Sequence, residues 1–251
     1  MKRNRLGIVL VAGLLVAAVA AGFGLTRSNG TRAEGETPLF TFNYPPTPTV
    51  GAAPAGGNSV ASASLFSDSF ENDTSLAKWE FVDLSFVIPE DRALWGVLDG
   101  RLAQRGTVGT RSPKPNPIAA FAGPADQQDY TITAQVYDQY NGTAGLIVRR
   151  TGDSFYRFRT TSALYEASPR YALELVQGDK VTMIASAEGT GYPMREWVTL
   201  ALKVSGSEIT ASMNGKTVLT ATDATLASGQ AGIYTLAMDE IFFDNVDVTQ
   251  P

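Results

Sequence analysis

The chain has 251 residues, of which 44% are hydrophobic, carries a formal net charge of −5, and contains neither cysteine nor histidine. This inventory excludes disulfides, zinc sites of the usual Cys/His kind, cysteine nucleophiles and histidine-based catalytic triads. Residues 1–64 hold five Lys or Arg against two Glu, a net of +3, so residues 65–251 carry −8. An acidic domain lacks the basic surface that duplex binding needs, and we therefore expect no nucleic-acid partner.

The N-terminus combines a basic flank with an apolar run. Three basic residues among the first five precede residues 6–25, which contain no charged side chain. This pattern is typical of a signal peptide or of a membrane-spanning anchor, and either would place the following chain outside the cytoplasm. The run is long enough to cross a membrane as a helix, which favours the anchor, whereas Ala18-Val19-Ala20 resembles a cleavage site. We expect residues 1–25 to be a signal anchor or signal peptide, and the protein to be extracytoplasmic, either anchored to the membrane or secreted.

A polar, proline-rich stretch follows the apolar run. Residues 26–64 are rich in Pro, Gly, Thr and Ser, as in Pro45-Pro46-Thr47-Pro48-Thr49. Such a stretch has too little apolar volume to offset its ordering entropy, and its prolines favour extended backbone. We expect residues 26–64 to be a disordered spacer that holds the domain of residues 65–251 away from the membrane.

Residues 197–204 show the two-residue period of a half-buried strand. From Val198 on, apolar side chains at even positions alternate with smaller or polar side chains at odd positions, as in an antiparallel strand with one face in the core. Asn214-Gly215 supplies two residues that tolerate positive φ, as a tight hairpin turn requires. Similar strands are expected at residues 95–98, 101–105, 130–136, 144–149, 155–160, 170–176, 181–187, 208–213, 217–220, 231–236 and 241–248.

The spacing of these strands predicts the fold class. Gly-rich turns separate them at short intervals, and no amphipathic helix is expected after residue 64. Many short strands with this punctuation indicate a sandwich or a barrel. We also expect Trp79, Trp95 and Trp197 to lie in the core, since each stands at a strand start or within an alternating run.

Several motifs occur together in a recognisable order. They are Phe66-Ser-Asp-Ser-Phe70, Trp95-x-Val-x-Asp-Gly100, Ala144-Gly-Leu-Ile-Val-Arg149, the strand of residues 197–204, Met213-Asn-Gly215 and Phe243-Asp-Asn-Val246. Together they resemble the concanavalin A-like lectin/glucanase superfamily, especially bacterial laminin-G-like jelly-roll domains. The resemblance implies an all-β, two-sheet antiparallel jelly-roll sandwich, here preceded by an N-terminal apolar helix and a disordered linker. It also implies sugar ligands on a concave face or at its rim.

The glucanase branch of that superfamily carries a Glu-x-Asp-x-x-Glu strand motif, which places two carboxylates on one face for retaining hydrolysis. This chain has no such motif, and its nearest counterpart, residues 239–244, lacks the central Asp. We therefore expect no catalytic residues, and the chain is more typical of a binding protein than of an enzyme.

The last predicted strand changes phase at Asp244-Asn245, because Ile241 and Phe243 have the opposite parity to Val246 and Val248. A bulge there would redirect Asp244.

By analogy with related sandwiches, in which calcium often joins the first and last strands, Asp68 and Asp244 are the candidate ligands for a structural Ca²⁺. The alternative is that Asp68 caps a turn and Asp244 pairs with an arginine or a backbone amide.

Aromatic and basic residues supply the candidates for sugar binding, because sugar rings stack on aromatic faces and polar side chains hold their hydroxyl groups. In residues 155–159, Arg157 and Arg159 share one face, which could receive an anionic sugar. The alternative is that the arginines pair with carboxylates and the tyrosines complete the core. The candidate ligand-binding residues are Arg149, Arg157, Arg159, Tyr137, Tyr156 and Tyr171.

The sequence thus predicts an exported, membrane-tethered, non-catalytic carbohydrate-binding or adhesive module, whose partners are a glycan or extracellular polysaccharide and, through the N-terminal segment, the membrane. Two alternatives stay open at this point. One is a glycoside hydrolase with an unrecognised carboxylate pair, and the other is a structural cell-surface domain without a small ligand.

Overall fold

The computed structural model describes residues 45–48, 62–85, 88, 92–106, 117–164, 168–236 and 240–251. The chain divides into two compact units, Met1–Tyr44 and Pro45–Pro251, and all described residues belong to the second. The predicted N-terminal helix and most of the predicted linker lie outside the described residues. Within the part of the chain that is described, no helix is long and apolar enough to cross a membrane.

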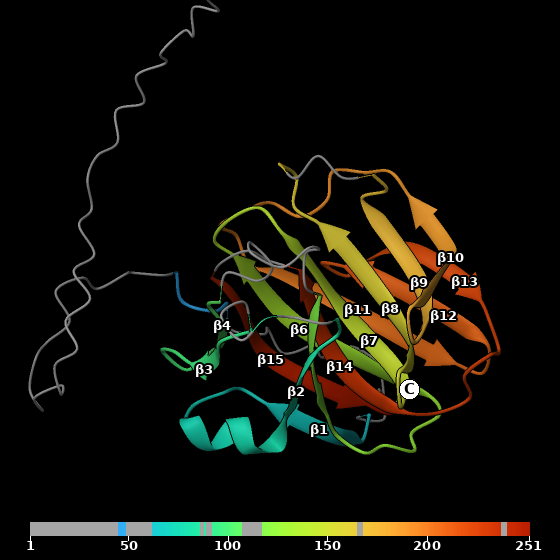
Figure 1. Cartoon of the computed structure of the whole chain (residues 1–251), viewed down its shortest axis with the longest axis horizontal. Coiled ribbons are helices and arrows are strands. Elements are labelled where there is room, and N and C mark those ends of the chain that lie inside the picture. Colours follow the sequence, from blue (N-terminus) through green and yellow to red (C-terminus); the bar gives the residue numbers. More distant parts are fainter. Residues whose placement is uncertain are drawn as a thin grey trace, which may run out of the picture. The chain divides into compact units, whose positions relative to one another are not determined.

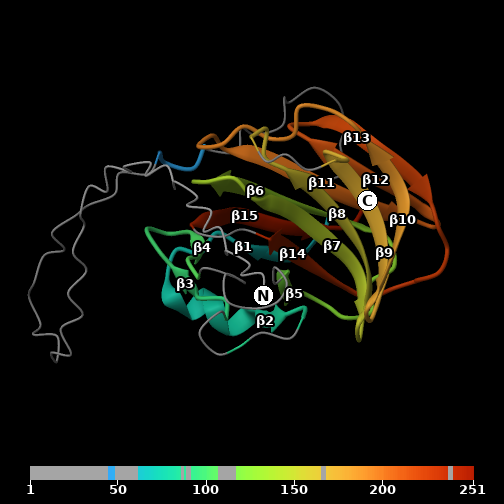
Figure 2. The same cartoon turned by 45° about the horizontal axis from the view of Figure 1, so that its top comes forward.

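The second unit is built from two antiparallel sheets, shown in Figures 1 and 2. The eight-stranded sheet has the order β13 (Lys216–Thr222), β12 (Glu208–Met213), β11 (Val198–Ser205), β6 (Tyr130–Asp138), β15 (Ile241–Thr249), β4 (Leu102–Gln104) and β3 (Trp95–Val97), and β1 (Ser64–Asp68) also pairs with β15. The seven-stranded sheet has the order β10 (Lys180–Ala187), β9 (Tyr171–Gln177), β8 (Ser154–Thr161), β7 (Thr143–Thr151), β14 (Gln230–Leu236), β5 (Ile118–Ala122) and β2 (Glu80–Asp83). The predicted all-β, two-sheet antiparallel sandwich is confirmed.

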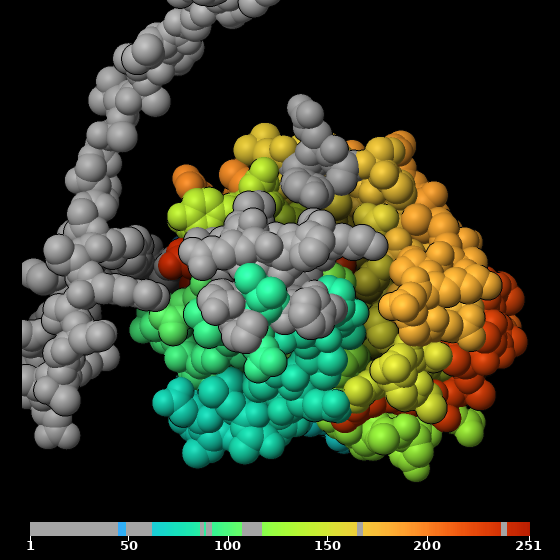
Figure 3. Space-filling view, viewed as in Figure 1, coloured from blue at the N-terminus to red at the C-terminus, as the bar shows by residue number. Residues whose placement is uncertain are grey.

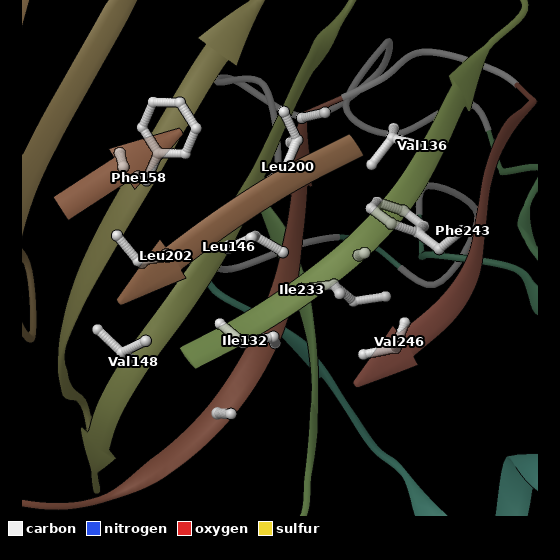
Figure 4. Packing of buried hydrophobic residues seen from close by; sticks show 14 of the residues in the cluster. Ile132, Val136, Leu146, Val148, Phe158, Leu200, Leu202, Ile233, Phe243 and Val246 are labelled. Atoms are coloured by element: carbon white, nitrogen blue, oxygen red, sulfur yellow. The ribbon is translucent and has the colours of Figure 1, made fainter. Parts of the chain in front are cut away.

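The core lies between the two sheets and follows from the two-residue alternation. In β11, Val198, Leu200, Leu202 and Val204 are all buried in it. Figure 4 shows Leu200 and Leu202 with side chains of β6, β7, β8, β14 and β15. Complete burial of one such side chain stabilises the fold by about 1.5–3 kcal/mol.

Two tight turns have the backbone that their sequences predict. Asp99 and Gly100, between β3 and β4, have φ of 51° and 69°, and Asn214 and Gly215, between β12 and β13, have φ of 49° and 76°. Two consecutive residues with positive φ are the mark of the type I′ hairpin turn, whose twist matches that of the flanking strands. The predicted hairpin at Asn214-Gly215 is confirmed, and Asp99-Gly100 forms a second one between β3 and β4.

Strands β2 and β5 and the short 3-10 helix η1 (Asp73–Lys78) are absent from the sequence-based prediction. All five residues of β5 are buried. Its Ala120 and Ala122 join the core between the sheets, and Ala119 and Phe121 join a second apolar cluster. A strand buried on both faces has no alternation, so the pattern that reveals the other strands fails here.

The three tryptophans differ in their surroundings. Trp79 is buried, and Trp95 packs against the core beside Phe81. The expectation for Trp197 is wrong, because this side chain is only half-buried and contacts Tyr137 on the outer face of the eight-stranded sheet. Successive side chains of a strand point to opposite faces, so Trp197, which directly precedes the core-facing Val198, points to the outer face.

Candidate functional site

A pocket of about 530 Å³ opens on the outer face of the seven-stranded sheet. Its described lining comes from both edge strands and from strands between them. The lining residues are Val82, Asp83, Leu84, Ser85, Pro117, Phe121, Arg150, Gly152, Asp153, Phe155, Arg157, Val176, Gly178, Asp179 and Val181.

The composition of this lining shows that the sheet curls around the pocket. Val82 belongs to one edge strand, β2, and Val181 to the other, β10. Seven strands spaced about 4.8 Å apart would hold the two edges about 29 Å apart if the sheet were flat, whereas one pocket of about 530 Å³ has residues of both edges in its lining. Residues of both edges can line it only if this face is concave. In Figure 3 the teal atoms around β2 and the yellow-orange atoms around β9 and β10 lie on the same face of the molecule.

The floor of the pocket is apolar. Phe121 and Phe155 have ring centroids 6.4 Å apart and belong to the second apolar cluster. Phe121 lies opposite Gly232 of β14, where an added Cβ would stand 2.6 Å from the phenylalanine ring. The glycine therefore leaves the space that the ring occupies.

Two hairpin turns bring aspartates to one rim of the pocket. Strands β8 and β9 pair Ser154 with Gln177, so the β7–β8 and β9–β10 turns lie side by side. The amide of Gly178 donates a hydrogen bond of 2.9 Å to the carbonyl of Asp153. Asp153 and Asp179 are both exposed, and both line the pocket.

Arg157 and Arg159 share the outer face of β8, as the alternation predicts, and both are paired with one carboxylate. Arg157 donates from Nε and Nη2 to Oε2 of Glu174, at 2.9 and 2.6 Å, and Arg159 donates from Nε to Oε1, at 2.9 Å. The Arg157 guanidinium also lies 4.5 Å from the ring centroid of Tyr234. The structure thus shows the pairing alternative for these two arginines, although Arg157 still lines the pocket.

Arg150 contributes a second cation to the pocket. Its guanidinium lies 4.3 Å from the ring centroid of Phe121, and its Nη2 donates to Oε1 of Glu80 at 3.0 Å. The pair with Glu80 lowers the pKa of that carboxyl group. Arg150 therefore covers an aromatic ring while its Nε donates to the carbonyl of Gly152 and its Nη1 donates to Gln230.

The other predicted ligand-binding residues lie elsewhere. Arg149 is almost completely buried, and its side chain donates to the carbonyls of Gln128 and Leu226. Tyr156 and Tyr171 belong to the core between the sheets, and Tyr137 lies on the outer face of the other sheet. The pocket thus brings Arg157 together with residues that sequence reasoning missed, above all Phe121, Phe155, Arg150, Asp153 and Asp179. Gly152-Asp153 and Gly178-Asp179 are typical turn sequences, but the adjacency of the two turns depends on the pairing of β8 with β9.

The predicted metal ligand Asp68 is the centre of a local hydrogen-bond network. Its carboxylate accepts from the Phe70 amide at 3.0 Å, from the Ser75 hydroxyl at 2.8 Å and from Trp79 Nε1 at 3.0 Å, with Lys78 Nζ at 3.5 Å. Burial opposes ionisation, but these donors outweigh it and lower the pKa of Asp68. Calcium requires six to eight oxygen ligands. The surroundings of Asp68, made of N–H, O–H and ammonium donors, therefore fit a hydrogen-bonded carboxylate.

Asp244 lies in the predicted bulge, which the structure confirms. The pairing of β15 with β6 shifts register between Asp244 and Asp247, and Asn245 has φ of 46°. The Asp244 carboxylate accepts from the Asn245 amide at 2.7 Å. Among the described residues there is no group of three or more Asp, Glu, His or Cys side chains placed to hold a metal ion. The predicted pairing of Asp68 and Asp244 around calcium stays a prediction.

Residues 64–249 match the family described as the 3-keto-alpha-glucoside-1,2-lyase-like domain. The chain belongs to this family. A comparison with curated proteins found no match.

Solved structures with the same fold confirm the resemblance to concanavalin A-like proteins. Carbohydrate-binding module 66 from Bacillus subtilis has a TM-score of 0.53 at 14% identity, covering 69% of this chain and 96% of its own. A B. subtilis protein of unknown function with a galectin-like fold has a TM-score of 0.54 at 12% identity, and the match covers 75% of this chain and 96% of that protein. The exoplasmic/lumenal domain of VIP36, in a Ca²⁺-bound form, has a TM-score of 0.50 at 11% identity, and the match covers 75% of this chain and 90% of that domain. At these identities the likeness concerns the fold.

Proposed function

We propose that this domain is a carbohydrate-binding module and that the pocket on the concave face is its binding site. The observation that carries the proposal is the pocket's composition, with an apolar floor of Phe121 and Phe155 and polar groups at the rim. Sugars combine apolar C–H faces with hydroxyl groups, and sites that bind them combine aromatic surface with a few placed polar groups. The glucoside named in the family description and the carbohydrate-binding module that shares the fold support a glycan ligand.

The rim groups have complementary roles in this proposal. The exposed carboxylates of Asp153 and Asp179 accept hydrogen bonds from sugar hydroxyls. Arg150 already donates to Glu80, Gly152 and Gln230, so its part is to cover the Phe121 ring. Arg157 already gives its donors to Glu174, so it serves to hold the floor in place and does not select for an anionic sugar. We therefore expect a neutral glycan, bound weakly per site, as in an adhesive module.

A glycan array with residues 45–251 tests this proposal, run with Ca²⁺ and with chelator. Binding to a defined set of oligosaccharides is expected, and the double variant Asp153→Ala/Asp179→Ala should lose it at least tenfold. Glu208→Ala, which removes an exposed carboxylate from the other sheet, is the matched control and should bind as the unmodified protein does. Absence of any specific glycan signal would favour a structural surface domain instead.

Catalysis on a glucoside is the second candidate, favoured by the family description and by the three aspartates, Asp83, Asp153 and Asp179, that line one pocket. Incubation with glucosides and 3-keto-glucosides, followed by chromatography of the products, tests it. Cleavage that disappears in Asp→Asn variants of the pocket would establish an enzyme. Binding without cleavage would establish the module.

We also propose that the domain acts outside the cytoplasm, held at the membrane by residues 1–25. The basic flank and the uncharged run of residues 6–25 support this. Protease treatment of intact cells should degrade the domain, and protection of the domain would contradict export.

A further inference from the structure

A group of aromatic side chains lies on the outer face of the eight-stranded sheet. The pocket described above lies on the other sheet. The ring centroid of Tyr137 lies 5.4 Å from that of Trp197 and 6.1 Å from that of Phe242. The Arg101 guanidinium lies 5.7 Å from the Trp197 ring centroid. We call Tyr137, Trp197 and Phe242 the aromatic platform.

A proline-rich segment of the same chain lies on this platform. Trp197 Nε1 donates to the carbonyl of Pro45 at 3.2 Å, and Gln135 Nε2 donates to the carbonyl of Pro48 at 3.1 Å. Figure 2 shows residues 45–48, in blue, beside the ends of β6 and β11. We call residues 45–48 the strap. It was expected to be part of a spacer, yet it belongs to the same compact unit as the sandwich.

A third contact involves the middle of the strap. The side chain of Thr47 hydrogen-bonds to Asp244, which is the cross-strand neighbour of Gln135. Burial raises the pKa of Asp244, and the Thr47 contact opposes that rise. The bulge at Asn245 thus places Asp244 where it reaches the strap.

The chemistry of the strap suits such a surface. A proline-rich segment favours the polyproline II conformation, which repeats every three residues, so the carbonyls of Pro45 and Pro48 point to the same side. Pro45 and Thr47 each precede a proline, which restricts them to extended backbone before any contact is made. A pre-ordered segment with free carbonyls loses little entropy when it docks on aromatic rings and side-chain donors.

Several side chains on this outer face are buried. Gln135 and Tyr137 are buried although they stand on the outer face, whereas Thr199 and Lys203 of the neighbouring β11 are exposed. Arg101 is also buried beside the platform, and within the described residues its Nη1 has no hydrogen-bond partner.

We propose that the aromatic platform is a recognition site for proline-rich segments and that the strap is its resident ligand. When the strap is removed, the site takes up a Pro-Pro-Thr-Pro segment supplied on another chain. This activity is independent of the concave pocket, so it stands or falls separately from glycan binding.

The three tryptophans give a direct readout, because each contributes one indole N–H signal to a ¹H–¹⁵N spectrum. Trp197→Phe assigns the relevant signal in the full chain. The triple variant Pro45→Gly/Pro46→Gly/Pro48→Gly should move the Trp197 signal toward that of a solvent-exposed indole and leave the Trp79 and Trp95 signals in place. Pro38→Gly/Pro54→Gly, which changes prolines outside the strap, is the matched control and should move none of the three.

The synthetic peptide Tyr-Pro-Pro-Thr-Pro-Thr, which has the sequence of residues 44–49, should then restore the Trp197 signal of the triple variant in a saturable way. Gln135→Ala in the same background should weaken the peptide at least threefold, and a peptide with all prolines replaced by alanine should not bind. An unchanged Trp197 signal in the triple variant, or no response to the peptide, would overturn the proposal. A response to oligosaccharides but not to the peptide would also overturn it, since the platform would then be a second sugar site.

Discussion

At the scale of single residues, Glu174 is the carboxylate on which the outer face of the seven-stranded sheet depends. It is 3% exposed and is the hydrogen-bond acceptor for both Arg157 and Arg159. A buried ion pair adds little net stability, but removal of one partner leaves the other charge buried without compensation. Glu174 therefore fixes the positions of the two arginine side chains more than it adds to the stability of the fold.

Glu174→Gln should lower the free energy of unfolding by about 3–5 kcal/mol, because two largely buried guanidinium groups lose their counter-charge. Glu80→Gln provides the control, since Glu80 pairs with Arg150 but its side chain is 54% exposed, and a loss of at most about 1 kcal/mol is expected there. Urea denaturation measures both. Equal losses for the two variants would contradict this account of Glu174.

Asp138 and Asp68 should make the free energy of unfolding depend on pH in opposite directions, because the pKa of Asp138 is raised and that of Asp68 is lowered. Burial raises its pKa to about 6, from 3.8, although the Tyr192 hydroxyl donates to it at 2.6 Å. Because the pKa of the folded state lies above that of the unfolded state, the folded state binds more protons in the window between them. The free energy of unfolding therefore falls as the pH rises from about 4 to 6, by a total of about 3 kcal/mol.

Asp138→Asn should remove this slope, because the neutral amide has no charge to bury and the Tyr192 hydroxyl can accept from it. The difference in the free energy of unfolding between the variant and the unmodified protein, followed from pH 4 to 8, isolates Asp138. The lowered pKa of Asp68 acts below this window, since its stabilisation is lost only as the pH falls below about 3.8. A difference that does not change with pH would refute the assignment.

At the scale of elements, the bulge in β15 determines what the last strand presents to each face. Phe243 and Val246 both reach the core despite their opposite parity, and Asp244 between them faces outward. Asn245 makes this possible with its left-handed backbone, and its side-chain amide donates to Gln135 at 2.9 Å. The change of phase was readable in the sequence because apolar residues mark the core face on both sides of it.

Asn245→Ala should cost about 1–2 kcal/mol more stability than Asn245→Gly. Both variants lose the bond to Gln135, but only alanine meets the steric penalty of positive φ. Thermal unfolding of the two variants side by side measures the difference. If they unfold at the same temperature, the bulge has relaxed or carries no strain.

The junction of β1 with β15 tests the calcium hypothesis. Because Asp68 is surrounded by hydrogen-bond donors, we expect the unmodified protein to unfold at the same temperature with Ca²⁺ and with chelator. Asp68→Asn should lower that temperature in both conditions, since the amide cannot accept from all of its partners. A drop on chelation that Asp244→Asn abolishes would instead establish the predicted metal bridge.

At the scale of the whole molecule, alternation and turn chemistry were enough to predict the sandwich, because most strands have one buried and one solvent-facing side. They failed for β5, which is buried on both faces, and for the pocket, which exists only because the sheet curls until Val82 and Val181 line one space. Curvature and the pairing of distant strands leave no local pattern. The sequence pattern placed the arginines of β8 on the correct face. It could not show their partner, because Glu174 belongs to the neighbouring strand β9.

The central claim is that a glycan binds in the concave pocket, and chemical-shift mapping of a bound oligosaccharide tests it most directly. Titration of a ¹⁵N-labelled protein of residues 45–251 with the best array ligand should shift the amides of Gly152, Asp153, Gly178 and Asp179, and leave those of β11 and β12 unchanged. Shifts confined to the surroundings of Trp197 and Tyr137, with none at the two hairpin turns, would contradict the claim.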